Sequence, residues 1–281
     1  MIGEEPSYGG GIATMARGGP GASWLDRHLQ TDEPEYLDRD DAPDEVKQRV
    51  VRMPDRLGSV MGLHEKSART ALDVVADIPS PRILELGAGH GQLSAKILQL
   101  QPRATLTVSD LDPTSVANIA ASALGADPRV YTQVVDATAI DAADDSYDLV
   151  VFTQAFHHLS PPAACRAIAE ATRVGKRFLI IDLQRQPLLM VMSALKPLVQ
   201  LVVWPFASVR PLVHDGYISA LRAYSRSALT ALTRAAGPGL DRVPAATDRL
   251  RAAVVRRAHR ARQRSPHSEM TTPTTGMEAS E

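Results

Sequence analysis

Short apolar runs alternate with segments of helical periodicity through the middle of the chain. The apolar runs predict strands, and the segments between them, whose apolar residues recur at three- and four-residue spacings, predict helices. The predicted strands cover residues 82–86, 105–109, 130–135, 147–153 and 177–182, and the predicted helices cover residues 93–100, 114–123 and 162–172. Because this alternation is typical of a parallel sheet covered on both faces, we expect a doubly wound α/β fold with its sites at the carboxyl ends of the strands.

The regions before and after this core have weaker patterns. Residues 45–76 show helical spacing and predict N-terminal helices. A further helical run covers residues 219–236, and two short apolar runs at 240–243 and 250–255 predict strands. We expect residues 1–30, which are rich in glycine, to form a flexible arm, and residues 259–281, which lack apolar periodicity, to form a disordered tail.

One long apolar stretch, residues 188–206, raises the question of a membrane. Lys196, Pro197 and Pro205 interrupt it, whereas a bilayer-spanning helix needs roughly 20 apolar residues in a row. Three interpretations stay open: a buried helix pair, an apolar lid over a ligand, or a face that rests on a membrane or lipid surface. Since the N-terminus has no basic and apolar signal-peptide pattern, we expect a cytoplasmic protein.

Composition narrows the function classes. The chain has 281 residues, a formal net charge of −1 and only 4% aromatic residues, which argues against a nucleic-acid binder. Its single cysteine, Cys165, excludes an intramolecular disulfide and a cysteine-rich zinc site, and no metal is expected.

The strongest local signal is the run LELGAGHG at residues 84–91, between the first predicted strand and the next helix. Glycines there allow a tight turn and a close approach of the backbone to a ligand, and the helix start adds free N–H groups. The dinucleotide pattern G-x-G-x-x-G fails at Gln92, and the Gly-Lys-Ser/Thr of a phosphate-binding loop is absent. Glu85 would repel a pyrophosphate but suits a ligand with a cationic or amino group.

Two further acids end the next two predicted strands. Asp110 is placed to accept hydrogen bonds from ribose hydroxyls, and Asp136 is placed to accept one from the exocyclic amine of adenine. An adenosine joined to a cationic amino acid satisfies Glu85, Asp110 and Asp136 together, and S-adenosylmethionine is such a molecule. A coincidence of ordinary turns and helix caps at three successive strand ends is the less favoured alternative.

Residues 82–182 carry LELGAGHG, VSDLDP, VVDA and YDLVVFTQAFHHL in this order. This set resembles the class I S-adenosylmethionine-dependent methyltransferases, and the residues after Asp182 resemble their small-molecule, ubiquinone-biosynthesis-like branch. The resemblance implies a Rossmann-like fold with a seven-stranded, mostly parallel sheet whose last two strands form an antiparallel hairpin. It also implies one methyltransferase domain over residues 31–258, with a helical cap over the acceptor at about residues 185–218.

The resemblance also assigns roles to single residues. Glu85, Gly87 and Gly89, with Ala88 and Gly91 of the same loop, would line the methionine end of the cofactor. The remaining cofactor contacts would be Asp110 on the ribose, Leu111 on the adenine ring, Asp136 and Ala137 on the adenine edge, and Thr153 after the fourth strand.

The expected reaction is methyl transfer to an oxygen or carbon of a small, apolar acceptor. His158, after the fourth strand, and His214, beside Asp215, are candidates for a base on the acceptor side, although both also fit purely structural roles. Residues 153–156 read Thr-Gln-Ala-Phe instead of the Asn/Asp-Pro-Pro-aromatic signature of base-modifying enzymes, so nucleic acid is not the expected acceptor. The alternatives are a nicotinamide-dependent oxidoreductase and a catalytically silent cofactor-binding interaction module. The oligomeric state stays open.

Overall fold

The computed structural model describes most of the chain between residues 11 and 257. The described residues are 11–36, 39, 41, 43, 45–47, 50, 62–185, 210–245 and 251–257. The apolar stretch 188–206, the tail 259–281 and residues 1–10 of the expected arm therefore lie outside the described residues. Among the helices that are described, none has the length and apolar character needed to cross a bilayer.

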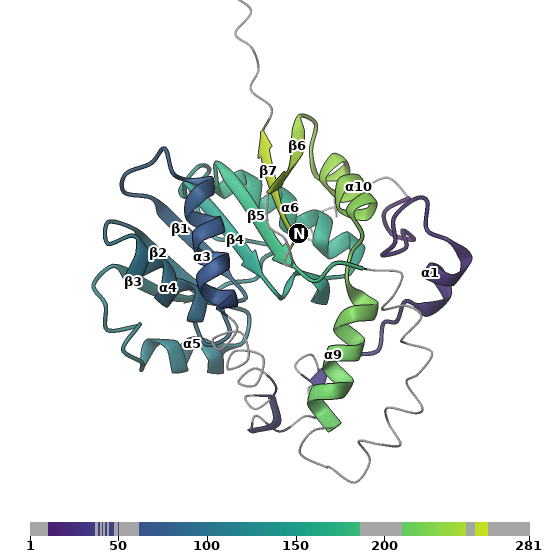
Figure 1. Cartoon of the computed structure of the whole chain (residues 1–281), viewed down its shortest axis with the longest axis horizontal. Helices are drawn as coiled ribbons and strands as arrows, with labels where there is room; N and C mark the ends of the chain where they lie inside the picture. Colours follow the sequence, from purple (N-terminus) through teal and green to yellow (C-terminus); the bar gives the residue numbers. More distant parts are fainter. Residues whose placement is uncertain are drawn as a thin grey trace, which may run out of the picture.

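A single twisted sheet forms the centre of the molecule (Figure 1). Its strands lie in the order β3 (Val130–Val134), β2 (Thr105–Asp110), β1 (Arg82–Leu86), β4 (Leu149–Thr153), β5 (Arg177–Asp182), β7 (Arg251–Arg257) and β6 (Leu240–Ala245). Neighbouring strands from β3 to β5 are parallel, while β7 runs antiparallel to both β5 and β6. The expected parallel α/β sheet is thus confirmed.

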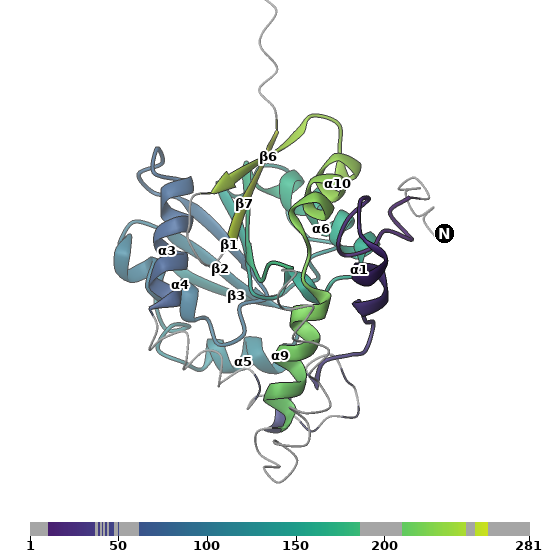
Figure 2. The same ribbon diagram turned by 45° about the vertical axis from the view of Figure 1, so that its right-hand side comes forward.

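Helices cover both faces of this sheet (Figures 1 and 2). One face packs against α3 (Leu63–Val74), α4 (Gln92–Leu100) and α5 (Pro113–Ala120), and the other against α6 (Pro161–Val174) and α10 (Arg226–Ala236). Because successive strand residues point to opposite faces, Ile83 joins the first core and Leu84 the second. This two-sided burial explains why the strands read as continuous apolar runs.

The helical run predicted at residues 219–236 is wrong as a single element. The structure has two helices there, α9 (Arg210–Arg222) and α10, separated by residues 223–225. Ser225 caps α10 because its hydroxyl accepts a hydrogen bond from Ala228 N at 3.1 Å. Tyr224, between the helices, forms an isolated bridge with Gln184 and is buried. The sequence signal for this break was the Tyr-Ser pair, which apolar periodicity alone does not register.

The N-terminal segment also differs from the prediction of a flexible arm. Residues 11–30, which include α1 (Trp24–Leu29), pack on the side of the sheet that carries α6 and α10 (Figure 2). Arg17 is buried, and its guanidinium donates hydrogen bonds to the backbone oxygens of His157 at 2.8 Å and Arg222 at 2.6 Å. These long-range bonds hold a glycine-rich segment in place, which its composition could not reveal.

Candidate functional site

The turn between β1 and α4 is shaped by its glycines. Gly87, Gly89 and Gly91 have φ values of 63°, 56° and 72°, in the left-handed region that favours glycine. A Cβ atom on Gly87 would lie 2.9 Å from Phe152 Cε2 and 3.0 Å from Ala155 Cβ. The loop therefore lies directly against the carboxyl end of β4, and side chains are excluded there by both conformation and space.

Asp110, the last residue of β2, is bound to this glycine loop. Its Oδ2 accepts a hydrogen bond from Gly89 N at 2.8 Å, and its Oδ1 accepts one from Asp112 N at 3.0 Å. Ala88 N donates to the backbone oxygen of Ser109 at 2.9 Å, which fastens the loop to β2 a second time. The following residue, Leu111, leaves 67% of its surface exposed. A fixed carboxylate and an exposed apolar side chain thus stand next to the turn.

Glu85 lies beneath the loop instead of at its surface. Its side chain is buried, and the hydroxyl of Ser94 on α4 donates a hydrogen bond to its Oε2. The Ser109 hydroxyl donates to the backbone oxygen of Glu85 at 2.6 Å. Glu85 therefore links β1, β2 and α4.

Asp136 lies two residues beyond the end of β3. Val134, the last residue of that strand, is paired with Asp110, so the two acids follow neighbouring strand ends. Asp136 Oδ1 accepts hydrogen bonds from the backbone N and the hydroxyl of Thr138, both at 2.8 Å. Asp136 is exposed and its neighbour Ala137 is buried. The structure thus brings the glycine loop and these two acids to one edge of the sheet.

The carboxyl end of β4 holds two unusual residues. Thr153 has a buried hydroxyl oxygen with no hydrogen-bond partner among the residues that the structure describes. Gln154 has a φ of 55°, uncommon for a residue other than glycine, and its N donates to the backbone oxygen of Ile181 at 2.8 Å. Such strained positions concentrate at functional sites. No sequence pattern predicted the positive φ of Gln154.

After Gln154 the chain forms the short 3-10 helix η2 (Phe156–His158). His157 is buried, and its Nδ1 lies 2.8 Å from Oδ1 of Asp182 at the end of β5. The backbone N of His157 also donates to Asp182 Oδ2 at 2.8 Å. Burial alone would raise the pKa of the Asp182 carboxyl, but the attraction to His157 and these hydrogen bonds hold that pKa below its ordinary value. His157 and Asp182 therefore form a fixed pair.

The two candidate bases both face carboxylates from one N-terminal segment. His158 Nε2 lies 3.6 Å from Glu35 Oε2, and His214 Nε2 lies 3.0 Å from Glu33 Oε1. The other ring nitrogen of His214 lies 3.0 Å from Asp215 Oδ1. Each candidate base thus lies next to a carboxylate of a distant segment. No pattern in the acidic stretch that contains Glu33 and Glu35 predicted that these two carboxylates lie next to the histidines.

Comparison with known proteins identifies a family similar to the central part of the chain. The family described as "Methyltransferase domain" matches residues 83–177, which run from β1 to the start of β5. This match covers about a third of the chain and supports a class I methyltransferase domain over these residues. The expected family resemblance is thus confirmed for the part of the chain that holds the glycine loop, Asp110 and Asp136.

Named relatives of the methyltransferase domain differ in their reactions. The chain is 34% identical over 85 residues to a malonyl-[acyl-carrier protein] O-methyltransferase of Paenibacillus, a match that covers 29% of this chain and 31% of that protein. It is 30% identical over 131 residues to the ubiquinone/menaquinone biosynthesis C-methyltransferase UbiE of Dinoroseobacter shibae, covering 45% of this chain and 52% of that protein. The match therefore spans about half or less of these relatives.

Solved structures share the fold over a larger part of the chain than the family match covers. A structure described as a putative O-methyltransferase from Nostoc punctiforme superposes with a TM-score of 0.54 at 15% identity, covering 80% of this chain and 64% of that one. The plantazolicin methyltransferase BpumL, in complex with a desmethyl analogue and S-adenosylhomocysteine (SAH), gives a TM-score of 0.51 at 14% identity, with 76% and 98% coverage. At such identities these likenesses establish the fold alone.

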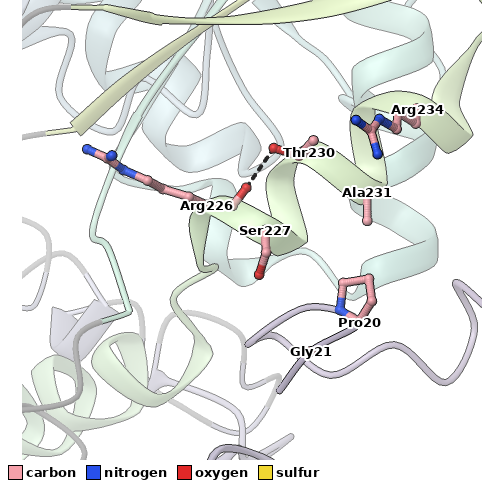
Figure 3. Close-up of a pocket in the computed structure, with 7 residues that line it drawn as sticks. All are labelled: Pro20, Gly21, Arg226, Ser227, Thr230, Ala231 and Arg234. Atoms are coloured by element: carbon pink, nitrogen blue, oxygen red, sulfur yellow. Dashed lines mark hydrogen bonds between the residues drawn. The ribbon is translucent and has the colours of Figure 1, made fainter. Parts of the chain in front are cut away.

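One cavity within the described residues lies outside this group of site residues. It has a volume of about 350 Å³ and lies between residues 20–21 and α10, where Ser227, Thr230 and Ala231 contribute to its wall (Figure 3). None of the predicted site residues lines it. The candidate site is thus defined by the strand ends and the glycine loop, not by this cavity.

Proposed function

We propose that this chain transfers a methyl group from S-adenosylmethionine to a small-molecule acceptor, at oxygen or at carbon. The observation that carries the proposal is the 2.8 Å hydrogen bond from Gly89 N to Asp110, which joins two motifs expected to bind one ligand. The SAH complex of a protein with the same fold supports this choice of cofactor. Relatives named for O- and for C-methylation support both reactions.

The residues at this edge fit such a cofactor. The backbone at Gly87 offers a surface without Cβ atoms, and the buried hydroxyl oxygen of Thr153 still lacks a partner within the described structure. Asp110 would bind the ribose hydroxyls, with the exposed Leu111 against the adenine ring. The other contacts would be those expected from the sequence: Asp136 and Ala137 at the adenine edge, and Glu85, Ala88, Gly89 and Gly91 around the methionine end.

The cofactor supplies a methyl group activated by its sulfonium, and the chain has to align an acceptor with it. Alignment of two reactants is worth at most roughly 7–11 kcal/mol. An acceptor hydroxyl or an acidic carbon also has to lose a proton. We propose His158 and His214 as the groups that accept it, because each imidazole faces a carboxylate.

The test compares Asp110→Ala with Asp73→Ala. Asp73 is an exposed carboxylate on α3 and lies outside the glycine loop. Isothermal titration with SAH measures cofactor affinity. We expect Asp110→Ala to weaken binding by about 1–3 kcal/mol, roughly 5- to 150-fold, because a charge-assisted hydrogen bond is lost, whereas Asp73→Ala should bind like the unmodified protein.

A titration with NAD and a methyl-transfer assay separate the alternatives. Binding of NAD without binding of SAH would favour an oxidoreductase and contradict the proposal. A chain that binds SAH but releases no labelled methyl group to any member of a broad panel of phenols, quinol precursors and acyl acids would be a silent cofactor-binding module. Equal SAH affinity of both Asp variants would remove Asp110 from the site.

A further inference from the structure

Glu35 of the N-terminal segment and the two histidines of η2, His157 and His158, form a cluster whose geometry suits a metal ion. Each residue offers one ligand atom, and these atoms all lie within 4.8 Å of one another. Glu35 and His157 are buried, and His158 is partly exposed. We propose that these three side chains bind one divalent transition-metal ion with the ligand preferences of zinc.

The spacing of the ligand atoms supports this proposal. His157 Nε2 lies 3.6 Å from Glu35 Oε1, and His158 Nε2 lies 3.6 Å from Glu35 Oε2. Hydrogen bonds from ring nitrogens to carboxylates are about 2.7–2.9 Å long. Ligands at 2.0–2.1 Å from a tetrahedral zinc ion, by contrast, are about 3.4 Å from each other. Each imidazole thus approaches one oxygen of the carboxylate at about the separation of two ligands of one ion, and all three ligand atoms lie within 4.8 Å of one another.

Asp182 gives His157 the support that metal-binding histidines typically have. A ligating histidine usually donates its second ring N–H to a carboxylate, which fixes the tautomer and directs the other nitrogen at the metal. The 2.8 Å contact between His157 Nδ1 and Asp182 Oδ1 meets this requirement and leaves Nε2 directed toward Glu35. The neighbouring rings of His157 and His158 have centroids 4.5 Å apart and planes inclined by 33°, so their edges can face a common point.

The charges around the cluster favour zinc over magnesium or calcium. Arg222 Nη1 lies 3.9 Å from Glu35 Oε1, and Arg17 donates to the backbone oxygen of His157. The Arg222 guanidinium offsets part of the charge of Glu35, and Arg17 adds a second positive charge nearby, so attraction between charges alone does not draw in a dication. Affinity must then come from the imidazole nitrogens, which suit zinc and not the oxygen-seeking ions.

The position of the cluster indicates a role in binding the methyl acceptor. This part of the inference rests on the proposed function. Both histidines follow β4 and Asp182 ends β5, so the ion would lie at the same edge of the sheet as the glycine loop. With the ion bound, His158 is a ligand and no longer a proton acceptor, so His214 alone keeps that proposed role. Two histidines and one carboxylate leave a tetrahedral ion one open position. An oxygen anion of the acceptor can fill it, and it would also compensate the positive charge that the ion adds.

The test is a zinc titration of tag-free, full-length protein from which metals have been removed with a chelator. We expect one zinc ion per chain by calorimetry, visible absorption of a tetrahedral site when cobalt(II) replaces zinc, and no binding of magnesium. His158→Gln and Glu35→Gln should each lower zinc affinity at least about 100-fold, and Asp182→Asn should lower it about 10- to 100-fold.

His214→Gln is the matched control. His214 also lies between two carboxylates, but Glu33 and Asp215 face opposite ring nitrogens, so the three cannot share one ion. Zinc affinity should be unchanged in this variant. Cooperative heat unfolding shows which variants are folded. Because His158 is partly exposed, we expect His158→Gln to fold, and it serves as the test variant if Glu35→Gln does not fold.

The result that overturns the proposal is the lack of stoichiometric zinc binding by the unmodified chain, or an equal loss of affinity in His214→Gln and His158→Gln. Either outcome would identify the cluster as a network of ion pairs. Titration with SAH on the same samples tests the proposed function separately, because SAH affinity depends on the glycine loop and Asp110 and not on the metal cluster. Zinc binding without SAH binding would contradict the methyltransferase proposal and leave the metal site standing.

Discussion

Replacing Gly87 by alanine tests whether the glycine loop is shaped by backbone conformation or by contact with β4. A side chain at φ 63° costs about 1–2 kcal/mol in backbone strain. The new Cβ would also lie 2.9 Å from Phe152 Cε2 and 3.0 Å from Ala155 Cβ. Phe152 is buried and the Cβ of Ala155 is attached to the backbone, so neither atom can move away without displacing its surroundings. Such overpacking costs typically about 1–3 kcal/mol.

The chain provides a control in Gly62, which has a similar φ of 66° but no atom within 4 Å of its Cβ position. Alanine at either site also stabilises by about 0.4–1 kcal/mol through the unfolded state. The net expectation is a loss of about 1–4 kcal/mol for Gly87→Ala and of about 0–1.5 kcal/mol for Gly62→Ala.

Urea unfolding followed by circular dichroism measures the free energy of unfolding of both variants. Titration with SAH shows whether a displaced loop also loses its ligand, which we expect only for Gly87→Ala. If both variants lose the same free energy, the contact with β4 plays no part and the loop is set by backbone conformation alone.

Two further predictions concern stability away from the site. Gly216 is exposed within α9 and has no atom within 4 Å of its Cβ position, so Gly216→Ala should stabilise the protein by about 0.5–1 kcal/mol in urea unfolding; a loss of stability would contradict the described helix. Asp148 accepts hydrogen bonds from Lys176 Nζ at 2.8 Å and Arg82 N at 2.9 Å, and these contacts hold its pKa below the ordinary value although burial alone would raise it. Because the folded pKa is lowered, the stabilisation is complete above about pH 4 and is lost as the pH falls through the folded pKa. Asp148→Asn should therefore cost about 1–3 kcal/mol at pH 7, and its stability should approach that of the unmodified protein in acid; a constant difference at all pH values would show that the carboxylate charge is not the cause.

Predictions from the sequence were most accurate for elements whose structure is determined by one short segment. The strand–turn–helix at residues 82–100 follows from an apolar run, a set of glycines and a helical period, and the structure has these elements within a residue or two. The approach of Asp110 to Gly89 also follows from local patterns, because parallel strands bring their carboxyl ends to one edge.

Contacts between distant segments could not be predicted in this way. Arg17 is buried by bonds to residues 140 and 205 positions away, and Glu35 reaches histidines more than 120 positions away. Periodicity describes which face of an element is apolar but carries no information about which acid meets which base. The glycine-rich composition of residues 11–30 even favoured the wrong interpretation, because it describes conformational freedom in the unfolded chain and not the contacts that remove it.

Several of these distant contacts involve residues outside the family match. The methyltransferase domain match ends at residue 177, before Asp182 and α9, and begins after Glu33 and Glu35. The matched residues thus include the glycine loop and the acids proposed to hold the cofactor, while carboxylates that face His157, His158 and His214 come from outside the match. We therefore propose that the N-terminal segment and α9, which lie outside the match, contribute to the choice of acceptor.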